Sequence, residues 1–369
     1  MTLLTERIPF LDLASLHADL REELDLAWKS VLESGRFVGG PEVERFEERF
    51  AAYCGTAHCV GVANGTDALE LILAALGIGR GDEVIVPANT FIATVEAVHA
   101  VGARPRFVDV RPDTLLIDPE AVAAAINRAT AAVIGVHLFG QMVDVDRLGA
   151  LAERHGLAFI EDAAQAHGAR YRGRRAGSAG VAGAFSFYPG KNLGALGDGG
   201  AVVTDDAQLA ARIRSMADHG RSATDRQLHD LRGRNSRLDA LQAAVLSVKL
   251  PHLDAGNERR RALMARYREN LPAFCTPVAE DPQGEPVYHL AVVQVPDRDR
   301  VAGALTAAGI GWGVHYRVPC HLQPAFAEFT ERLPVAERAA ERILSLPMSP
   351  TLSDDQVIRV CEVLRGVQR

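Results

Sequence analysis

The feature that most constrains the fold is an alternation of short Val- and Ile-rich runs with longer amphipathic stretches between about residues 60 and 204. This alternation is typical of a mostly parallel sheet covered by helices. The runs are almost continuously apolar, which indicates strands buried on both faces, as in a doubly wound α/β fold. The expected strands are Cys59–Val62, Val84–Val86, Arg106–Val110, Ala132–Val136, Leu157–Ile160, Ala184–Phe187 and Ala201–Val203. The expected helices are Thr66–Ala75, Thr90–Ala100, Pro119–Ile126 and Val145–His155.

The 369 residues leave room for two domains. Leu238, Leu241, Val245 and Val248 recur at helical spacing, and Pro251 ends that helix. We therefore expect a large domain over residues 1–250 and a smaller α+β domain over residues 251–369. In the second domain the expected strands are Tyr288–Val295 and Gly311–His315. Helices are expected from Arg259 and over residues 298–308, 335–344 and 354–364.

Charge and cysteine content limit the classes of function. The formal net charge is −7, which gives no basis for nucleic-acid or anionic-membrane partners. No apolar run approaches the ~20 residues of a membrane-spanning helix, and Glu6, Arg7 and Pro9 interrupt the start, so we expect no export signal. The five cysteines are scattered and form no Cys-x-x-Cys pair, which favours reduced thiols in the cytoplasm.

Several familiar motifs are missing from the sequence. No Gly-x-Gly-x-x-Gly lies at a strand-to-helix turn, which argues against a dinucleotide site. Gly190-Lys191 is followed by Asn192, so a phosphate loop of the ATPase type is not predicted. His315, Cys320 and His321 are dense potential ligands without a fourth partner, so we predict no metal and favour substrate contact or packing.

Three segments follow expected strands, at the sheet edge where open α/β folds bind ligands. In Asn64–Leu69 a helix begins near Thr66, so its backbone N–H groups and hydroxyl could hold a phosphate; a plain capped turn fits equally well. In Glu161–His167, Asp162 and Gln165 share a helical face, and Asp162 could keep a bound pyridine nitrogen protonated. A solvent-exposed helix cap is the alternative.

The third segment, Ala184–Gly194, has a single lysine, Lys191, between glycines in a stretch without other charges. Desolvation lowers the pKa of an amine and makes it a nucleophile and base, as Schiff-base chemistry requires. A surface lysine with a buried stem is the alternative reading.

Taken together, these residues resemble the DegT/DnrJ/EryC1/StrS family of pyridoxal-phosphate-dependent sugar aminotransferases. The resemblance covers nearly the whole chain. Its markers are Phe37–Val43, Asn64–Leu69, Pro87–Phe91, Glu161–Gln165, Phe187–Asn192, Gly197–Gly200, Arg234–Asp239 and Val314–Tyr316. The resemblance implies the aspartate-aminotransferase-like fold (fold type I), pyridoxal 5′-phosphate as cofactor, and a homodimer whose active sites are shared across the interface.

The resemblance also implies a role for each matching residue. Lys191 would be the Schiff-base lysine, Asp162 the partner of the pyridinium nitrogen, and Gln165 a contact to the ring's phenolic oxygen. Gly65, Thr66 and Ser186 would bind the phosphate, Phe91 would stack on the ring, and Asn235 would reach the cofactor of the partner subunit. The residues expected on the sugar-nucleotide side are Tyr188, His315, Tyr316 and His321.

The expected reaction transfers an amino group from L-glutamate to a nucleotide-linked keto-sugar. The run Tyr188–Asp198 resembles the subgroup that acts on 3-keto sugars, such as dTDP-3-keto-6-deoxyhexoses or UDP-3-keto sugars; amination at C4 is the alternative. A dehydratase relative would carry His in place of Lys191, and a lyase would need a catalytic cysteine, for which Cys320 is the candidate. A non-catalytic regulator that binds the cofactor also remains open.

Overall fold

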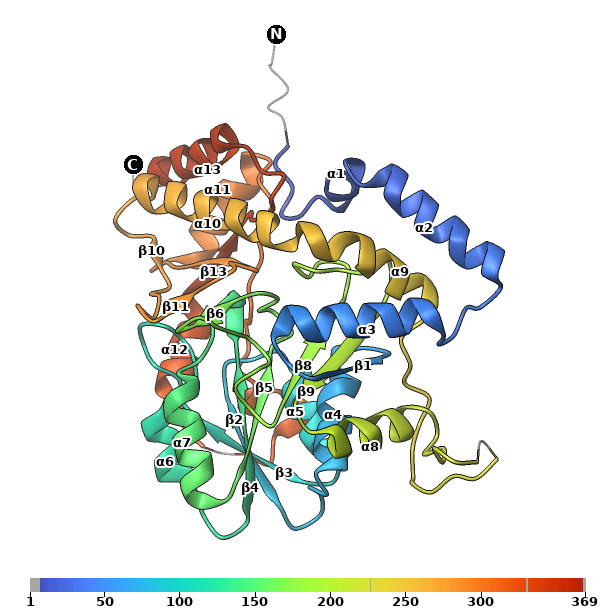
Figure 1. Ribbon diagram of the computed structural model, residues 1–369. Helices are drawn as coiled ribbons and strands as arrows, with labels where there is room; N and C mark the ends of the chain where they lie inside the picture. Colours follow the sequence, from blue (N-terminus) through green and yellow to red (C-terminus); the bar gives the residue numbers. More distant parts are fainter. Residues whose placement is uncertain (1–6, 226, 330, 368–369) are drawn as a thin grey trace.

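A seven-stranded sheet forms the centre of the computed structural model, which describes residues 7–225, 227–329 and 331–367 (Figure 1). Its order is β1-β9-β8-β5-β4-β2-β3. β9 pairs antiparallel with β1 and β8, and the other pairs are parallel. The strands are β1 (His58–Val62), β2 (Glu83–Pro87), β3 (Arg104–Val108), β4 (Thr130–Val136), β5 (Ala158–Asp162), β8 (Ala182–Ser186) and β9 (Gly200–Thr204). The predicted α/β class and its mostly parallel sheet are confirmed.

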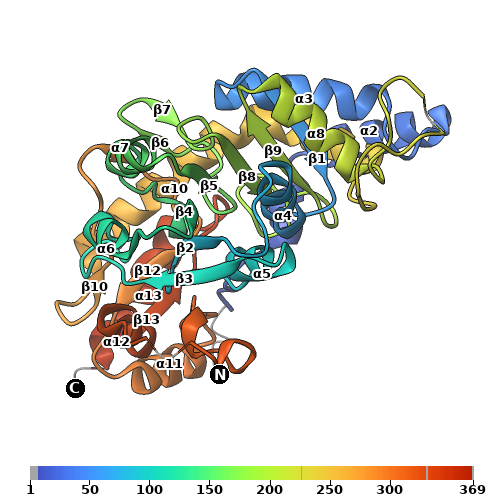
Figure 2. The ribbon, with the colours of Figure 1, turned by 90° about the horizontal axis from the view of Figure 1, so that it is seen from below.

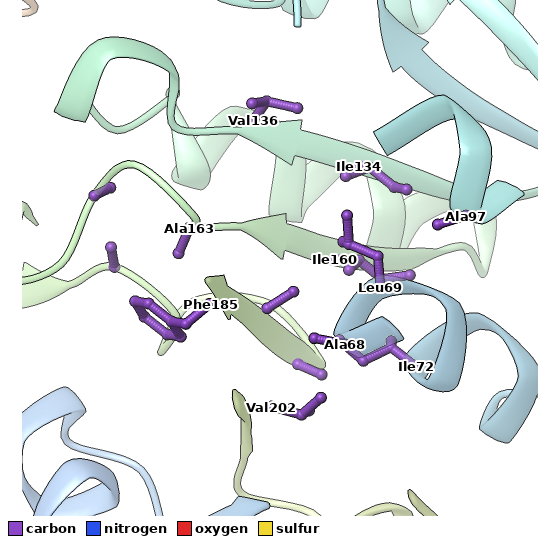
Figure 3. Packing of buried hydrophobic residues seen from close by; sticks show 14 of the residues in the cluster. Ala68, Leu69, Ile72, Ala97, Ile134, Val136, Ile160, Ala163, Phe185 and Val202 are labelled. Atoms are coloured by element: carbon purple, nitrogen blue, oxygen red, sulfur yellow. The ribbon is translucent and has the colours of Figure 1, made fainter. Parts of the chain in front are cut away.

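Helices cover both faces of this sheet. Figure 2 shows α6 and α7 on one side and α4 and α5 on the other. The helices around the sheet are α3 (Pro41–Cys54), α4 (Gly65–Ala75), α5 (Ala93–Ala100), α6 (Pro119–Ala125), α7 (Val145–His155), α8 (Ala207–Ala217) and α9 (Ala240–Lys249). Leu69 of α4 lies beside Ile160 of β5 in a fully apolar core (Figure 3). Burial of both sheet faces explains why the strands are continuously apolar.

Two small antiparallel sheets accompany the central one, and the second half of the chain supplies most of their strands. One has the order β10-β12-β13, with β10 (Thr276–Pro277), β12 (Ala291–Gln294) and β13 (Ile343–Leu346), and the other joins β11 (Gly284–Glu285) to β6 (Arg170–Tyr171) and β7 (Arg174–Arg175). The accompanying helices are α10 (Leu253–Asn270), α11 (Arg298–Ala307), α12 (Pro334–Arg342) and α13 (Asp354–Gly366). Short 3-10 helices cover Leu138–Gly140, Leu250–His252, Cys320–Leu322 and Pro324–Phe326. The domain boundary near residue 250 stays a prediction.

Two local predictions for this half were wrong. The helix expected over residues 335–344 ends at Arg342, and the next four residues form the fully buried strand β13. A short apolar run fits a buried helix and a buried strand equally well, so periodicity could not separate them. The expected strand Gly311–His315 is reduced to one bridge between Gly313 and Ser345.

The N-terminal segment pairs with residues 309–311 before α1 (Leu13–Ala18) and α2 (Arg21–Ser34) begin. Ile8 forms a parallel bridge with Ile310, and its carbonyl accepts a hydrogen bond of 2.7 Å from Gly311 N. A Cβ on Gly311 would lie 2.3 Å from Phe10 N, so only glycine permits this approach. The first described residues are therefore held by a segment about 300 residues further along the chain.

A buried polar cluster supports the end of β5. The Glu161 carboxylate, fully buried, accepts hydrogen bonds from the backbone N–H groups of Gly177, Ala179 and Gly180 at 2.6–3.0 Å and lies 2.8 Å from His137 Nε2. Burial alone would raise the pKa of Glu161, but the hydrogen bonds and the charge of His137 outweigh it and hold this pKa below its ordinary value. Glu161 is therefore a fully satisfied buried anion.

Three observations on the described residues concern membrane spans, metal ligands and cysteines. None of the helices formed by the described residues combines the length and apolar character needed to cross a lipid bilayer. In the same parts of the chain no three His, Cys, Asp or Glu side chains converge as ligands for a metal. The five cysteines are all buried free thiols.

We expect Glu161→Gln to lower the free energy of unfolding by about 3 kcal/mol or more, because an amide would turn an NH2 donor toward backbone N–H donors and leave them unpaired. Glu153→Gln is the matched control, since Glu153 is exposed at the end of α7. Urea denaturation measures both changes. Equal midpoints for the two variants would show that the buried cluster contributes nothing.

Candidate active site

A cavity of about 640 Å³ opens where the carboxyl ends of β4, β5 and β8 meet the N-terminus of α4. These strands contribute Val136, Asp162 and Ser186 to its wall, and α4 contributes Gly65 and Thr66. The volume suits a small organic ligand. The position at the carboxyl edge of a parallel sheet is the one predicted from the three motif-bearing segments.

Asp162 is the last residue of β5 and is almost fully buried in the cavity wall. Its Oδ2 accepts a hydrogen bond of 2.7 Å from the Thr94 hydroxyl, and its Oδ1 accepts one of 3.2 Å from Ala164 N. The Thr94 oxygen lies 2.8 Å from the Thr90 hydroxyl, one turn earlier. These contacts fix the orientation of a carboxylate that faces the cavity.

Gln165 lies between the 3-10 helix that contains Phe139 and the side chain of Tyr316. Its Oε1 accepts a hydrogen bond of 2.7 Å from Phe139 N, and its Nε2 donates one of 3.0 Å to the Tyr316 hydroxyl. Phe139 has a positive φ of 63°, a left-handed backbone that is uncommon outside glycine. The amide therefore has a fixed orientation because its two ends hold different partners.

The N-terminus of α4 forms an anion cradle against β8. Asn64 caps the helix by accepting a hydrogen bond of 2.8 Å from Asp67 N, which leaves the N–H groups of Gly65 and Thr66 without a partner inside the helix. A Cβ on Gly65 would lie 2.7 Å from Ser186 Cβ, so glycine is required for this approach. Backbone N–H groups, two hydroxyls and the helix dipole suit a phosphate.

Lys191 is the cation of this cavity, in a tight turn after β8. Its backbone N donates to Tyr188 O at 2.8 Å, and a Cβ on Gly194 would lie 2.3 Å from Pro189 O, which explains the neighbouring glycine. Burial lowers the pKa of Lys191 to about 8, although the Asp162 carboxylate opposes this shift. A useful fraction of the amine is therefore unprotonated near neutral pH.

Aromatic side chains line the opposite, more open wall. Phe91 and Tyr188 are exposed for half or more of their surface, and the Phe91 ring lies 5.6 Å from the ring of Tyr316. His315 stacks on Phe10 at 5.7 Å, and its Nδ1 lies 2.8 Å from Ser345 Oγ. Burial and the Lys191 charge lower the pKa of His315 to about 4, so this ring is neutral.

His321, expected on the sugar-nucleotide side, and Asn235, expected to reach the cofactor of a partner subunit, do not line the cavity. His321 is almost fully buried in a 3-10 helix, with Nε2 at 3.3 Å from Glu337 Oε1 and its ring beside Phe107. It therefore has a packing position in this chain, although only four residues lie between it and Tyr316. Asn235 is exposed and bridges to Asp218 outside the cavity. The remaining expected residues all line the cavity.

Sequence reasoning missed Thr94 and His289. Thr94 contacts the carboxylate of Asp162, and His289 lines the cavity. The spacing of Thr90 and Thr94 by one helical turn after β2 is a signal that could have indicated the first. The residues next to His289 in the sequence do not indicate a place in the site, because its partner there, Asn192, lies 97 residues earlier.

The polar groups that line the cavity fit pyridoxal 5′-phosphate. The α4 cradle that only glycine permits suits the phosphate, and a buried carboxylate and a desolvated lysine line the same cavity. The aromatic ring of Phe91 supplies an apolar face. The arrangement can bind a phosphorylated pyridine and move a proton with an amine.

Known proteins resemble this chain over nearly its full length. The model of the DegT/DnrJ/EryC1/StrS aminotransferase family matches residues 18–365. A dTDP-3-amino-3,4,6-trideoxy-alpha-D-glucose transaminase of Streptomyces venezuelae is 50% identical over 98% of this chain and 96% of its own length. The crystal structure of S. venezuelae DesV covers 99% of this chain and 100% of its own, with a TM-score of 0.96 and 50% identity. The structure of NtdA from Bacillus subtilis with bound cofactor PMP covers 98% of this chain and 85% of its own, with a TM-score of 0.91 and 32% identity.

We expect Lys191 in the cofactor-free protein to react with an amine-directed reagent with a midpoint near pH 8, because burial lowers its pKa to about 8. In the unfolded chain the midpoint should return to about 10.4, the value of a solvated lysine. Peptide mapping by mass spectrometry across a pH series measures both midpoints. The same midpoint in folded and unfolded chains would contradict a desolvated lysine.

Proposed function

The chain belongs to the DegT/DnrJ/EryC1/StrS aminotransferase family, and from this premise we propose that it aminates a nucleotide-linked keto-sugar at C3 with L-glutamate as amino donor. It is a nucleotide-sugar transaminase, and its cofactor is pyridoxal 5′-phosphate. The observation that carries the proposal is the convergence of Lys191, Asp162 and the α4 cradle on one cavity.

Pyridoxal phosphate, when bound, supplies an aldehyde for amines and a pyridinium ring that stabilises negative charge on the neighbouring carbon. Gly65, Thr66 and Ser186 would hold its phosphate through backbone N–H groups and hydroxyls. Gln165 would donate to its phenolic oxygen from Nε2, the end that also reaches Tyr316. Phe91 would cover one face of its ring.

Asp162 would hold a proton on the ring nitrogen. Its carboxylate accepts hydrogen bonds from the Thr94 hydroxyl and from Ala164 N, which hold it in one orientation. The cavity lining includes no other carboxylate except that of the exposed Asp198. A negative charge at this point favours a protonated pyridine nitrogen, which is the form that withdraws electrons best.

Lys191 would move the proton in both halves of the reaction. Its Nζ, with the pKa lowered to about 8, takes a proton from the α-carbon of the amino donor and later gives a proton to the sugar carbon that receives the amine. One base serves both halves, so we expect ping-pong kinetics.

The sugar would lie beside Tyr188, His315 and Tyr316, which line the open side of the cavity. Amination at C3 is supported by the name of the S. venezuelae relative, a 3-amino-sugar transaminase, and by the run Tyr188–Asp198. Amination at C4 is the alternative. The neutral His315 ring suits hydrogen bonds with sugar hydroxyls.

A homodimer would complete the site. Exposed apolar residues gather on α2 and the turn after it, which offers an unpaired surface: Leu26, Trp28, Leu32, Phe37 and Val38. Asn235, exposed and outside its own cavity, is free to reach the cofactor phosphate of the partner subunit. The free thiols of all five cysteines suit a reducing compartment, and we place the protein in the cytoplasm.

We expect Asp162→Asn to retain the cofactor but to slow the glutamate half-reaction by about 10²-fold or more, because the ring nitrogen loses its charged partner. Lys191→Ala should abolish both half-reactions, and Glu153→Gln, at an exposed carboxylate, should leave both unchanged. Stopped-flow absorbance of the bound cofactor measures the rates. An undiminished rate in Asp162→Asn would show that Asp162 is not the partner of the ring nitrogen.

We also expect glutamate-dependent amination of a 3-keto dTDP- or UDP-sugar and little amination of the matched 4-keto sugars. The products are separated by chromatography, and NMR identifies the aminated carbon. Amination at C4 alone would overturn the proposed specificity. Failure of glutamate to convert the bound cofactor to its amino form would instead support a regulatory protein.

A further inference from the structure

His289 is a cavity-lining group to which the proposed reaction gives no role. It lies between β11 and β12, partly buried, in the same cavity as Lys191. Arg260 secures the neighbouring backbone by donating to the Tyr288 carbonyl at 3.2 Å and to the Met348 carbonyl at 3.1 Å. The imidazole is therefore presented to the cavity by a fixed backbone.

The tautomer of His289 follows from a chain of amides that ends on two carbonyls. Asn257 Nδ2 donates to the His167 carbonyl at 2.8 Å, so Asn257 Oδ1 is the end that faces Asn192. Asn192 Nδ2 donates to that oxygen at 2.9 Å and to the Val287 carbonyl at 3.0 Å. Carbonyl oxygens only accept, so neither amide can be reversed.

Asn192 Oδ1 is therefore the end that faces His289, at 3.2 Å from Nδ1. Because an amide oxygen only accepts, the proton of His289 must be on Nδ1. In the neutral ring the remaining nitrogen, Nε2, is then a hydrogen-bond acceptor. Among the described residues no group donates to Nε2.

The surroundings keep this ring neutral. Burial lowers the pKa of His289 well below its ordinary value, and the cations Lys191 and Arg260 lower it further. The other titratable neighbours are the rings of His167 and His315. His289 is thus a neutral imidazole with a fixed acceptor.

Lys191 is the complementary group. In the described parts of the chain no atom accepts a hydrogen bond from its Nζ, yet the amine must carry a proton during each half of the proposed reaction. We propose that His289 Nε2 accepts a hydrogen bond from the protonated Lys191 amine, so that His289 is a positioning residue that orients the base. The inference adds to the proposed function, since its consequence for catalysis rests on Lys191 acting as the base.

Two substitutions at His289 distinguish a role of Nε2 as a hydrogen-bond acceptor from a role of the ring in packing. The amide of Asn reaches the position of Nδ1 and keeps the contact to Asn192, but it has no acceptor at the position of Nε2. The longer Gln carries its amide to the position of Nε2. Tyr288→Phe is the control, because the Tyr288 hydroxyl hydrogen-bonds to Glu280 and Arg268 and Tyr288 does not line the cavity.

The test measures the pH midpoint of Lys191 labelling in the cofactor-free protein. His289→Asn should lower this midpoint by at least about one pH unit, because the ammonium loses an acceptor. His289→Gln should restore most of the difference, and Tyr288→Phe should leave the midpoint unchanged. In the holoenzyme His289→Asn should lower kcat more than KM, because the base loses orientation rather than the substrate losing a contact.

An unchanged labelling midpoint in His289→Asn would overturn the proposal, as would a Gln variant that behaves like the Asn variant. Labelling needs neither cofactor nor sugar, so its outcome is independent of the proposed reaction. A normal shift in labelling with no transamination by the wild-type protein would contradict the proposed function and leave the Lys191–His289 contact standing.

Discussion

The arrangement of the cavity depends on the carboxylate of Glu161, which is fully buried and does not line the cavity. Successive side chains of a strand point to opposite faces, so Glu161 and Asp162 at the end of β5 face different surroundings. Three backbone N–H groups and His137 hold the first of them, and His137 N also donates to the Asp162 carbonyl at 3.0 Å. Because the two residues share a backbone, the anchored anion fixes the direction of the one that faces the cavity. The loop over residues 177–180 is held by the same charge.

The polar groups around Lys191 combine one buried anion with neutral rings. Asp162 is the carboxylate that opposes the desolvation of Lys191, while His289 and His315 have pKa values lowered by burial and by Lys191 itself. A neutral ring such as that of His289 can accept a hydrogen bond from the amine without placing a negative charge beside it. A carboxylate in either position would raise the pKa of Lys191 and reduce the fraction available as a base.

The strands and the residues that follow them could be predicted from the sequence because both depend on local patterns. The run of β4 is apolar from Ala131 onward, Asp162 ends β5, and Gly65 and Lys191 come shortly after the ends of β1 and β8. β13 could not be separated from α12, since a four-residue apolar run fits either state. The positions of His321 and His289 depend on distant partners, Glu337 across a turn and Asn192 across the fold. Such pairings are set by tertiary packing, which spacing along the chain does not encode.

The bridge between Ile8 and Ile310 has a consequence for how the protein is made. Phe10 and Leu11 line the cavity, and they are held in place by residues 309–311. During synthesis the large sheet can form as soon as β9 has left the ribosome, but its cavity still lacks this wall. The N-terminal segment must wait for more than three quarters of the chain before it can be seated. The wall that Phe10 and Leu11 form can therefore be completed only after residue 311 has been synthesised.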